Sequence, residues 1–250
     1  MVRKRFAHAY KIHRLQLGTL GIDKGFMTYF HDYGEDISAD FPIHFFYIEG
    51  PEENIIIDAG CPAEVGNKFW FGAKDIRTFE EALASVNLKP EEVDIIIATH
   101  LHFDHVTNAQ KCPNARVYVQ EEELRFAYSP HPLLAGMYSA SLLRDLRFIL
   151  IRGDQEIVPG VTAIYAPGHT PGTQAVAVET KDGLAIMTGF CCIEENFTEC
   201  PEPFKDIWGN VIPIGIHIDP VKAWESQLRV KGLADIIIPQ HGRRIPDVIG

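Results

Sequence analysis

Short apolar runs recur along the chain, separated by glycine, proline and polar residues. Nine of these runs have the length and β-branched content of buried strands: residues 45–48, 54–57, 93–98, 116–119, 148–151, 162–166, 175–178, 184–187 and 236–238. Three of them carry a triplet of isoleucine, a residue enriched in strands. The hydrophobic pattern therefore predicts nine buried strands.

Helix signals lie between several of these strands. Thr78 and Glu81 have the spacing of a capping box, which marks the start of a helix. Asp219 and Pro220 offer an N-cap and a first-turn proline before the segment 221–230. Strands interleaved with helices predict a layered α/β or α+β architecture.

Composition is that of an ordinary globular protein, with 46% hydrophobic and 23% charged residues. Because no repeat or low-complexity linker divides the sequence, we expect a single domain over residues 1–250. A net charge of -11 argues against a nucleic-acid partner, since phosphate binding relies on clustered basic residues. Five basic residues near the start are interpreted as a solvated segment: Arg3, Lys4, Arg5, Lys11 and Arg14.

The five cysteines are an odd number without the spacing of a disulfide framework, so free thiols are expected. No secretory signal follows Arg5, and no run of 18 apolar residues is present to cross a membrane. These features predict a cytoplasmic protein with no membrane partner.

A cluster of candidate metal ligands directly follows the predicted strand 93–98. It consists of His100, His102, Asp104 and His105. Imidazole and carboxylate groups are ligands for zinc and related ions, and a set without thiolates favours a catalytic over a structural site. His100 and His102 share one side of an extended segment, because side chains alternate along it. Asp104 and His105 follow where the chain turns, and could face a second ion.

Polar residues also follow three other predicted strands. Asp58, His169 and His241 come after the runs that end near residues 57, 166 and 238. Ligands of open α/β sheets bind at the carboxyl ends of the strands. We therefore expect these side chains to meet the histidine cluster in one site.

The segments 99–105, 167–172 and 239–242 together resemble the metallo-β-lactamase superfamily of hydrolases. The segments 153–161 and 194–197 are similar to its N-acyl-homoserine lactonase-like branch. The resemblance implies a four-layer αββα sandwich, with two mixed sheets face to face and helices outside. It also implies a site for two metal ions at one edge.

The resemblance assigns one ion to His100, His102 and His169, and the other to Asp104, His105 and His241. Asp58 would orient a ligand histidine without binding metal itself. The expected cofactor is a divalent metal, most readily two Zn²⁺, with Mn, Fe or Co as alternatives. Such ions supply a metal-bound hydroxide to attack a carbonyl carbon, and Asp104 is the candidate catalytic residue that accepts and returns a proton.

One position departs from the family pattern. The superfamily usually carries an aspartate that bridges both metals after the strand 184–187, whereas this chain has no carboxylate there before Glu194. A thiolate of Cys191 or Cys192 could replace it. A water-only bridge, a single occupied metal site and plain buried thiols are the alternatives. The tyrosine that assists homoserine lactonases beyond this aspartate also has no counterpart, so we expect a lactonase-like hydrolase with an altered site.

The leading functional hypothesis is hydrolysis of a small cyclic ester, cyclic amide or related carbonyl compound. A thioester or phosphodiester hydrolase, a redox dimetal enzyme, and a ligand-binding or regulatory protein with little turnover are the alternatives. The aromatic-rich segments 25–33, 67–72 and 203–208 are candidates for the walls of a small-molecule pocket. They fit a hydrophobic plug or a homodimer contact equally well.

Overall fold

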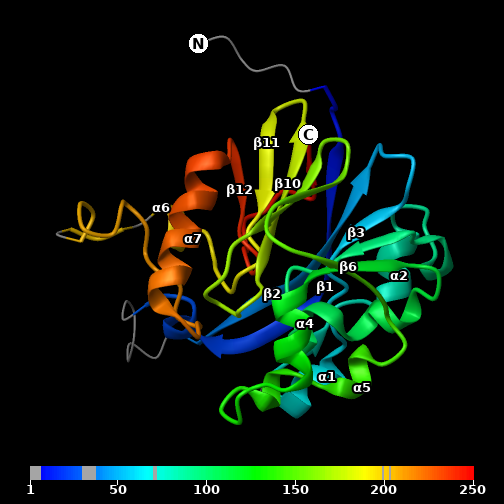
Figure 1. The fold of residues 1–250 in the computed structure, drawn as a ribbon, viewed down its shortest axis with the longest axis horizontal. Helices are drawn as coiled ribbons and strands as arrows, with labels where there is room; N and C mark the ends of the chain where they lie inside the picture. Colours follow the sequence, from blue (N-terminus) through cyan, green and yellow to red (C-terminus); the bar gives the residue numbers. More distant parts are fainter. Residues whose placement is uncertain (1–6, 30–37, 70–71, 199, 203) are drawn as a thin grey trace.

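Two mixed β-sheets lie face to face, and helices cover their outer faces (Figure 1). This computed structural model describes residues 7–29, 38–69, 72–198, 200–202 and 204–250. Within these residues, the larger sheet has the strand order β13-β1-β2-β3-β5-β6-β7, with β4 paired to β1, and the smaller sheet has the order β12-β11-β10-β9-β8. The predicted four-layer αββα sandwich is confirmed.

The strands of the larger sheet are β1 (Lys11–Asp23), β2 (Ser38–Glu49), β3 (Ile55–Ile57), β4 (Lys74–Asp75), β5 (Ile95–Ile97), β6 (Arg116–Gln120), β7 (Arg147–Ile151) and β13 (Val248–Ile249). Those of the smaller sheet are β8 (Gln155–Val158), β9 (Val161–Tyr165), β10 (Gln174–Thr180), β11 (Gly183–Met187) and β12 (Ile236–Ile238). The α-helices are α1 (Ala63–Phe69), α2 (Phe79–Ala84), α3 (Phe103–Val106), α4 (Glu121–Tyr128), α5 (Ala140–Leu143), α6 (Glu195–Thr198) and α7 (Pro220–Leu233). Short 3-10 helices are η1 (Lys24–Phe26), η2 (Pro90–Glu92), η3 (Thr107–Lys111) and η4 (Ala135–Met137).

The isoleucine triplets explain the layering, because successive side chains of a strand point to opposite faces. In β5, Ile95 and Ile97 pack between the two sheets, and Ile96 packs outward beneath α2. In β12, Ile238 likewise packs between the sheets, while Ile237 faces α7. The central strands are thus apolar on both faces, which requires helices on each outer side. None of the helices among the described residues is long and apolar enough to span a membrane.

All nine predicted strands are present, and both predicted helices begin at the predicted caps. Thr78 and Glu81 form the complete capping box of α2, and Asp219 accepts hydrogen bonds at the start of α7. The interpretation of the N-terminal basic residues was wrong for Arg14. This residue lies in β1 and its half-buried side chain pairs with Asp247. β1 escaped prediction because a bulge between Gln16 and Gly18 breaks its alternating pattern. Arg3, Lys4 and Arg5 lie outside the described residues.

Candidate metal centre

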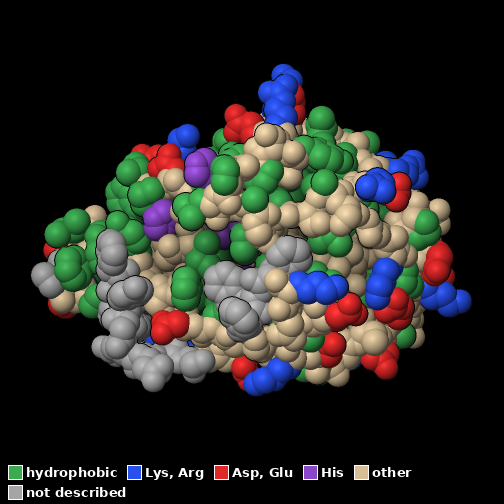
Figure 2. Space-filling view, turned by 90° about the horizontal axis from the view of Figure 1, so that it is seen from below, with side chains coloured by type: hydrophobic (Ala, Val, Ile, Leu, Met, Phe, Trp, Pro, Cys, Tyr) green, Lys and Arg blue, Asp and Glu red, His purple; other side chains and the backbone are tan. Residues whose placement is uncertain are grey.

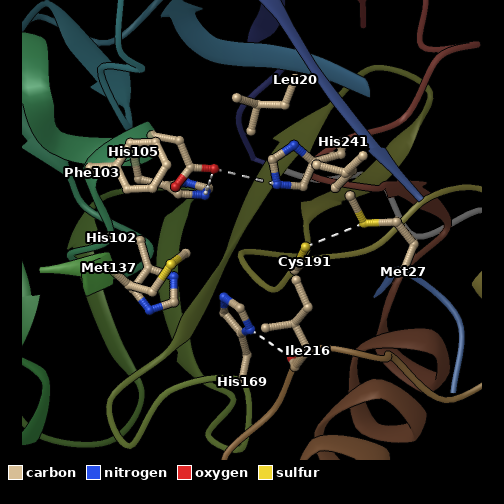
Figure 3. A pocket seen from close by; sticks show the side chains of 12 residues that line it. Leu20, Met27, His102, Phe103, His105, Met137, His169, Cys191, Ile216 and His241 are labelled. Carbon is tan, nitrogen blue, oxygen red and sulfur yellow. Dashed lines mark hydrogen bonds and ion pairs between the residues drawn. The ribbon is translucent and has the colours of Figure 1, made fainter. Parts of the chain in front are cut away.

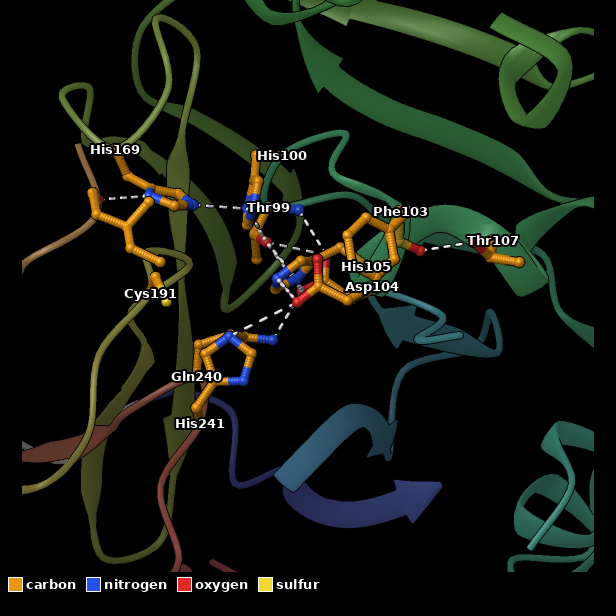
Figure 4. Close-up of polar contacts among 12 residues, drawn as sticks. Thr99, His100, Phe103, Asp104, His105, Thr107, His169, Cys191, Gln240 and His241 are labelled. Atoms are coloured by element: carbon orange, nitrogen blue, oxygen red, sulfur yellow. Dashed lines mark hydrogen bonds and ion pairs between the residues drawn. The ribbon is translucent and has the colours of Figure 1, made fainter. Parts of the chain in front are cut away.

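The candidate metal ligands meet where strands of both sheets end (Figure 4). β3 and β5 are parallel neighbours in register, so the turns that carry Asp58 and His100 leave the larger sheet side by side. β9 and β12 of the smaller sheet are followed by the loops that carry His169 and His241. The structure thus brings together residues that lie up to 183 positions apart, as the strand-end pattern predicted.

His100, His102 and His169 form the first cluster. Their ring centroids lie 4.6 to 4.9 Å from one another, and all three side chains are buried. One nitrogen from each ring lies within 4.8 Å of the others. Three converging imidazoles are a ligand set suited to a catalytic divalent ion that keeps an open position.

Asp104, His105 and His241 form the second cluster. Asp104 and His105 lie in α3, and Asp104 Oδ2 is 3.4 Å from His105 Nε2 and 3.8 Å from His241 Nε2. These three groups also lie within 4.8 Å of one another. The ring of His105 is 3.9 Å from that of His100, so the two clusters adjoin.

Hydrogen bonds at the nitrogens that face away from the site fix the tautomers of two candidate ligand histidines. Nδ1 of His169 lies 2.8 Å from the Ile216 carbonyl oxygen, and Nδ1 of His241 lies 3.0 Å from the Pro42 carbonyl oxygen. A carbonyl oxygen only accepts hydrogen bonds, so each Nδ1 must carry the proton. Nε2 of both rings is then left with a lone pair directed into the site, which is the state that metal ligation requires.

Asp58 holds His105 in the same way. Its Oδ2 is 2.8 Å from His105 Nδ1, and the carboxylate also accepts hydrogen bonds from Thr99 N, Thr99 Oγ1 and Gln240 Nε2. Because the hydroxyl of Thr99 donates its hydrogen bond to Asp58, Thr99 Oγ1 can accept a hydrogen bond from His100 Nδ1, which lies 3.1 Å away. Asp58 therefore sets the tautomers of His105 directly and of His100 through Thr99.

A divalent cation fits the space between these nitrogens. Nε2 of His169 lies 3.2 Å from Nε2 of His100, and both carry lone pairs by the argument above. Two lone pairs face each other favourably only when a positive charge lies between them. Burial lowers the pKa of His100 well below its ordinary value and that of His169 to about 4, so a proton on either ring does not supply that charge near neutral pH.

The second cluster carries more negative charge. Burial alone would lower the pKa of His105, but the carboxylates of Asp104 and Asp58 raise it to about 10. Burial would raise the pKa of Asp104, yet His105 and His241 hold it well below its usual range. Without metal, a proton on His105 thus supplies the positive charge that Asp104 attracts. A metal ion bound here would displace that proton.

The two cysteines occupy different environments. Cys191 lines the pocket beside His169 and His241, with its Sγ 3.3 Å from the Met27 sulfur (Figure 3). Cys192 is not brought to the site, since its Sγ lies 3.0 Å from Thr188 Oγ1 in the core beneath α7. Neither sulfur belongs to the two ligand groups found among the described residues. All five cysteines are free, as expected.

The two other residues that could stand in place of the bridging aspartate are not ligands. Gly189 has a φ of +74°, and a Cβ there would lie 2.1 Å from the Gln174 carbonyl oxygen. Phe190 is buried in the core beside Phe197. Of the segment that follows β11, only Cys191 therefore presents a metal-binding group to the pocket among the described residues.

Glu123 and Tyr138 are two neighbours of the site that the sequence did not reveal. Glu123 is fully buried and accepts hydrogen bonds from both loops that carry the first cluster, through Leu101 N and Gly172 N. Its position in an acidic run at the start of α4 does not predict this burial. Tyr138 packs edge-on against His102 at 4.8 Å, and its hydroxyl donates to Glu123 rather than into the pocket. It therefore does not replace the tyrosine of the homoserine lactonases.

A narrow pocket with a cavity volume of about 30 Å³ lies over the clusters. Five of the six candidate ligands line it, and its apolar walls are Leu20, Ile22, Met27, Phe103, Met137 and Ile216. Figure 2 shows one face of the molecule, on which hydrophobic side chains lie beside the visible histidines. Among the described residues of the aromatic-rich segments, only Met27, from the segment 25–33, lines this pocket. Ile207 and Trp208 line a separate surface pocket, and residues 30–37, 70–71 and 203 lie outside the described residues.

Comparisons with known proteins agree with this geometry. The profile of the metallo-beta-lactamase superfamily matches residues 39–189. An N-acyl homoserine lactonase of a Bacillus species is 32% identical over 205 residues, covering 77% of this chain and 76% of that protein. A quorum-quenching N-acyl homoserine lactone lactonase superposes with a TM-score of 0.76 at 26% identity, over 96% of this chain and 95% of that one.

A second solved structure is an N-acyl homoserine lactone hydrolase with the product N-hexanoyl-L-homoserine at its catalytic metal center. It has a TM-score of 0.73 at 26% identity and covers 93% of each chain. Fold, ligand clusters and relatives lead to the same assignment: this chain belongs to the metallo-beta-lactamase superfamily, as a metallo-hydrolase similar to the N-acyl homoserine lactonases.

Proposed function

We propose that the protein hydrolyses a small lactone, that is, a cyclic ester. The observation that carries the proposal is the pair of adjoining buried clusters of candidate ligands. Their unprotonated imidazole nitrogens and the carboxylate of Asp104 converge beneath an apolar pocket. The homoserine lactonases to which the chain is similar support a lactone ring as the reacting group.

The residues would hold two divalent ions. His100, His102 and His169 would bind one ion through uncharged nitrogens, and Asp104, His105 and His241 would bind the other with an added negative charge. Zn²⁺ suits both sets, and Mn, Fe or Co are alternatives. Ions bound there would polarise the substrate carbonyl and lower the pKa of a water molecule.

The chain itself contributes proton handling and exclusion of water. Asp104 is held anionic by its two histidine neighbours and is the candidate to accept a proton and return it to the leaving alkoxide. The apolar wall formed by Leu20, Met27 and Ile216 favours an uncharged substrate over a phosphodiester. We propose Cys191 as the further metal-binding group, because it alone faces the pocket from the segment after β11 among the described residues.

Metal content and a substrate screen test the proposal. The purified protein is expected to hold close to two divalent ions per chain, and to hydrolyse lactones faster than thioesters or phosphodiesters. The variant His102→Gln should lose at least about 100-fold in rate, whereas the exposed control His131→Gln should keep the wild-type rate. A protein that takes up no metal, or that prefers phosphodiesters, would contradict the proposal.

A further inference from the structure

Glu123 is a buried carboxylate with a full set of hydrogen-bond donors. It lies in the first turn of α4 and has no exposed surface. Its Oε1 accepts hydrogen bonds from Leu101 N at 2.9 Å and from Tyr138 Oη at 3.2 Å. Its Oε2 accepts from Thr170 Oγ1 at 2.5 Å and from Gly172 N at 3.1 Å. An ionised carboxylate offers about four such acceptor positions, and all four are used.

These four donors surround the first metal-ligand cluster. Leu101 lies between His100 and His102, so its N–H fixes the loop that carries both. Thr170 follows His169 directly, and its hydroxyl ties the second loop to the same carboxylate. One side chain therefore joins two loops that lie 69 residues apart in the sequence and supply all three ligands.

The close approach of the second loop depends on a glycine. A Cβ at Gly172 would lie 2.4 Å from Glu123 N and 2.5 Å from Glu123 Cβ. Tyr138 completes the arrangement, since its ring packs edge-on against His102 while its hydroxyl donates to Glu123. Among the residues that the structure describes, none of the four donors to Glu123 lies in α3, which carries Asp104 and His105, or in the loop that carries His241, although Leu101 precedes Asp104 by only three residues.

We propose that Glu123 is the positioning residue of the first metal site, setting the separation of His100, His102 and His169 without touching metal or substrate. The inference rests on the proposed function, because it takes these histidines as ligands. An amide in place of the carboxylate would turn an N–H₂ group toward two of the four donors and break the link between the loops. The second site should be unaffected, because Asp58 and Pro42 hold its histidines instead.

Metal affinity, measured one site at a time, tests this inference. Glu123→Gln is placed in a His241→Ala background, which retains the first site, and in a His169→Ala background, which retains the second. Zn²⁺ affinity is measured by chelator competition, and the geometry of the site by the visible spectrum of the Co²⁺ form. We expect a loss of about 10- to 100-fold and an altered Co²⁺ spectrum in the first background only. The control Glu122→Gln, one residue earlier and exposed, should change neither value.

Equal losses at both sites would mean that Glu123 acts only on overall folding, and unchanged affinity at both would mean that it positions nothing; either result overturns the inference. Tyr138→Phe removes a single donor and keeps the ring, so a smaller loss confined to the first site is expected even if Glu123→Gln does not fold. Absence of that loss counts against the inference. Failure of the wild-type protein to bind any metal would instead refute the proposed function itself.

Discussion

Asp58 Oδ2 lies 2.8 Å from His105 Nδ1, and this contact joins the turn after β3 to the helical turn after β5. The backbone of Asp58 has a φ of +59°, a left-handed conformation that aspartate tolerates better than most residues. Its N–H donates to the Ile97 carbonyl, and the N–H of Ala59 donates to the His105 carbonyl. Backbone and side chain together therefore hold the His105 ring in one orientation.

Replacement of Asp58 by asparagine should disturb this orientation. In Asp58→Asn the amide nitrogen would face the Nδ1 proton of His105, which favours the other tautomer and places a proton on Nε2. We expect the affinity of the second site for Zn²⁺ to fall about 10- to 100-fold. Asp94→Asn is the matched control. Asp94 accepts a hydrogen bond from Asn54 N at the other end of β3 and β5, away from the site. Similar affinities in both variants would contradict the tautomer argument.

The two adjacent cysteines offer a paired test of metal ligation. Burial and the charge of Asp104 raise the pKa of Cys191, so only a bound cation would keep its thiolate near neutral pH. We expect Cys191→Ser to lower the metal content or the rate by about 10-fold, and Cys192→Ser to change neither. Thiolate-to-Co²⁺ charge-transfer absorption should disappear only in the first variant. If Cys191→Ser retains both metal and rate, the thiol is not a ligand.

Acid should destabilise the metal-free protein through His44. Burial lowers the pKa of this residue to about 3, whereas the pKa of a histidine in the unfolded chain is about 6.5. The unfolded state therefore binds the proton first, and stability is lost as the pH falls below the unfolded pKa. Between pH 7 and 5 the loss should be about 2 kcal/mol from His44 alone.

His44→Gln isolates this contribution. The glutamine can still donate to the Gly242 carbonyl, as His44 Nε2 does at 2.8 Å, but it does not titrate. Urea unfolding of the chelator-treated proteins at pH 7 and pH 5 should show a pH dependence smaller by about 2 kcal/mol in the variant. An identical pH dependence in the two proteins would exclude His44 as the source.

Gly168 allows α7 to pack closely on the loop that carries His169. It has a φ of +128°, and an added Cβ would lie 2.1 Å from Ala223 N. We expect Gly168→Ala to cost more than about 2 kcal/mol of unfolding free energy and to lower the metal content of the first site. Gly232→Ala is the control. Gly232 lies in α7 itself, and a Cβ added there meets nothing within 4 Å. It should stabilise by up to about 1 kcal/mol, and equal effects would argue against the close contact.

Much of the architecture follows from local patterns in the sequence. Consecutive apolar side chains such as those of residues 95–97 point alternately to the two faces of a strand and must be buried on both, which dictates sheets covered by helices. The caps at Thr78 and Asp219 act within a few residues of their own positions, so they could be read directly. The six candidate His and Asp ligands could be identified from the sequence because each follows a buried strand. Whether they bind metal stays a prediction.

Tertiary structure alone decided what surrounds those ligands. Glu123 and Gln240 act on loops distant in sequence, and their roles depend on where the chain folds back, which no local spacing records. Cys191 and Cys192 are chemically alike, and only the path of the backbone after β11 directs one to the pocket and the other to the core. The sequence alone determined the types of ligand and the layers of the fold, through short-range periodicity. Long-range hydrogen bonds, which exist only once the two sheets are packed, decided the orientation of each ligand.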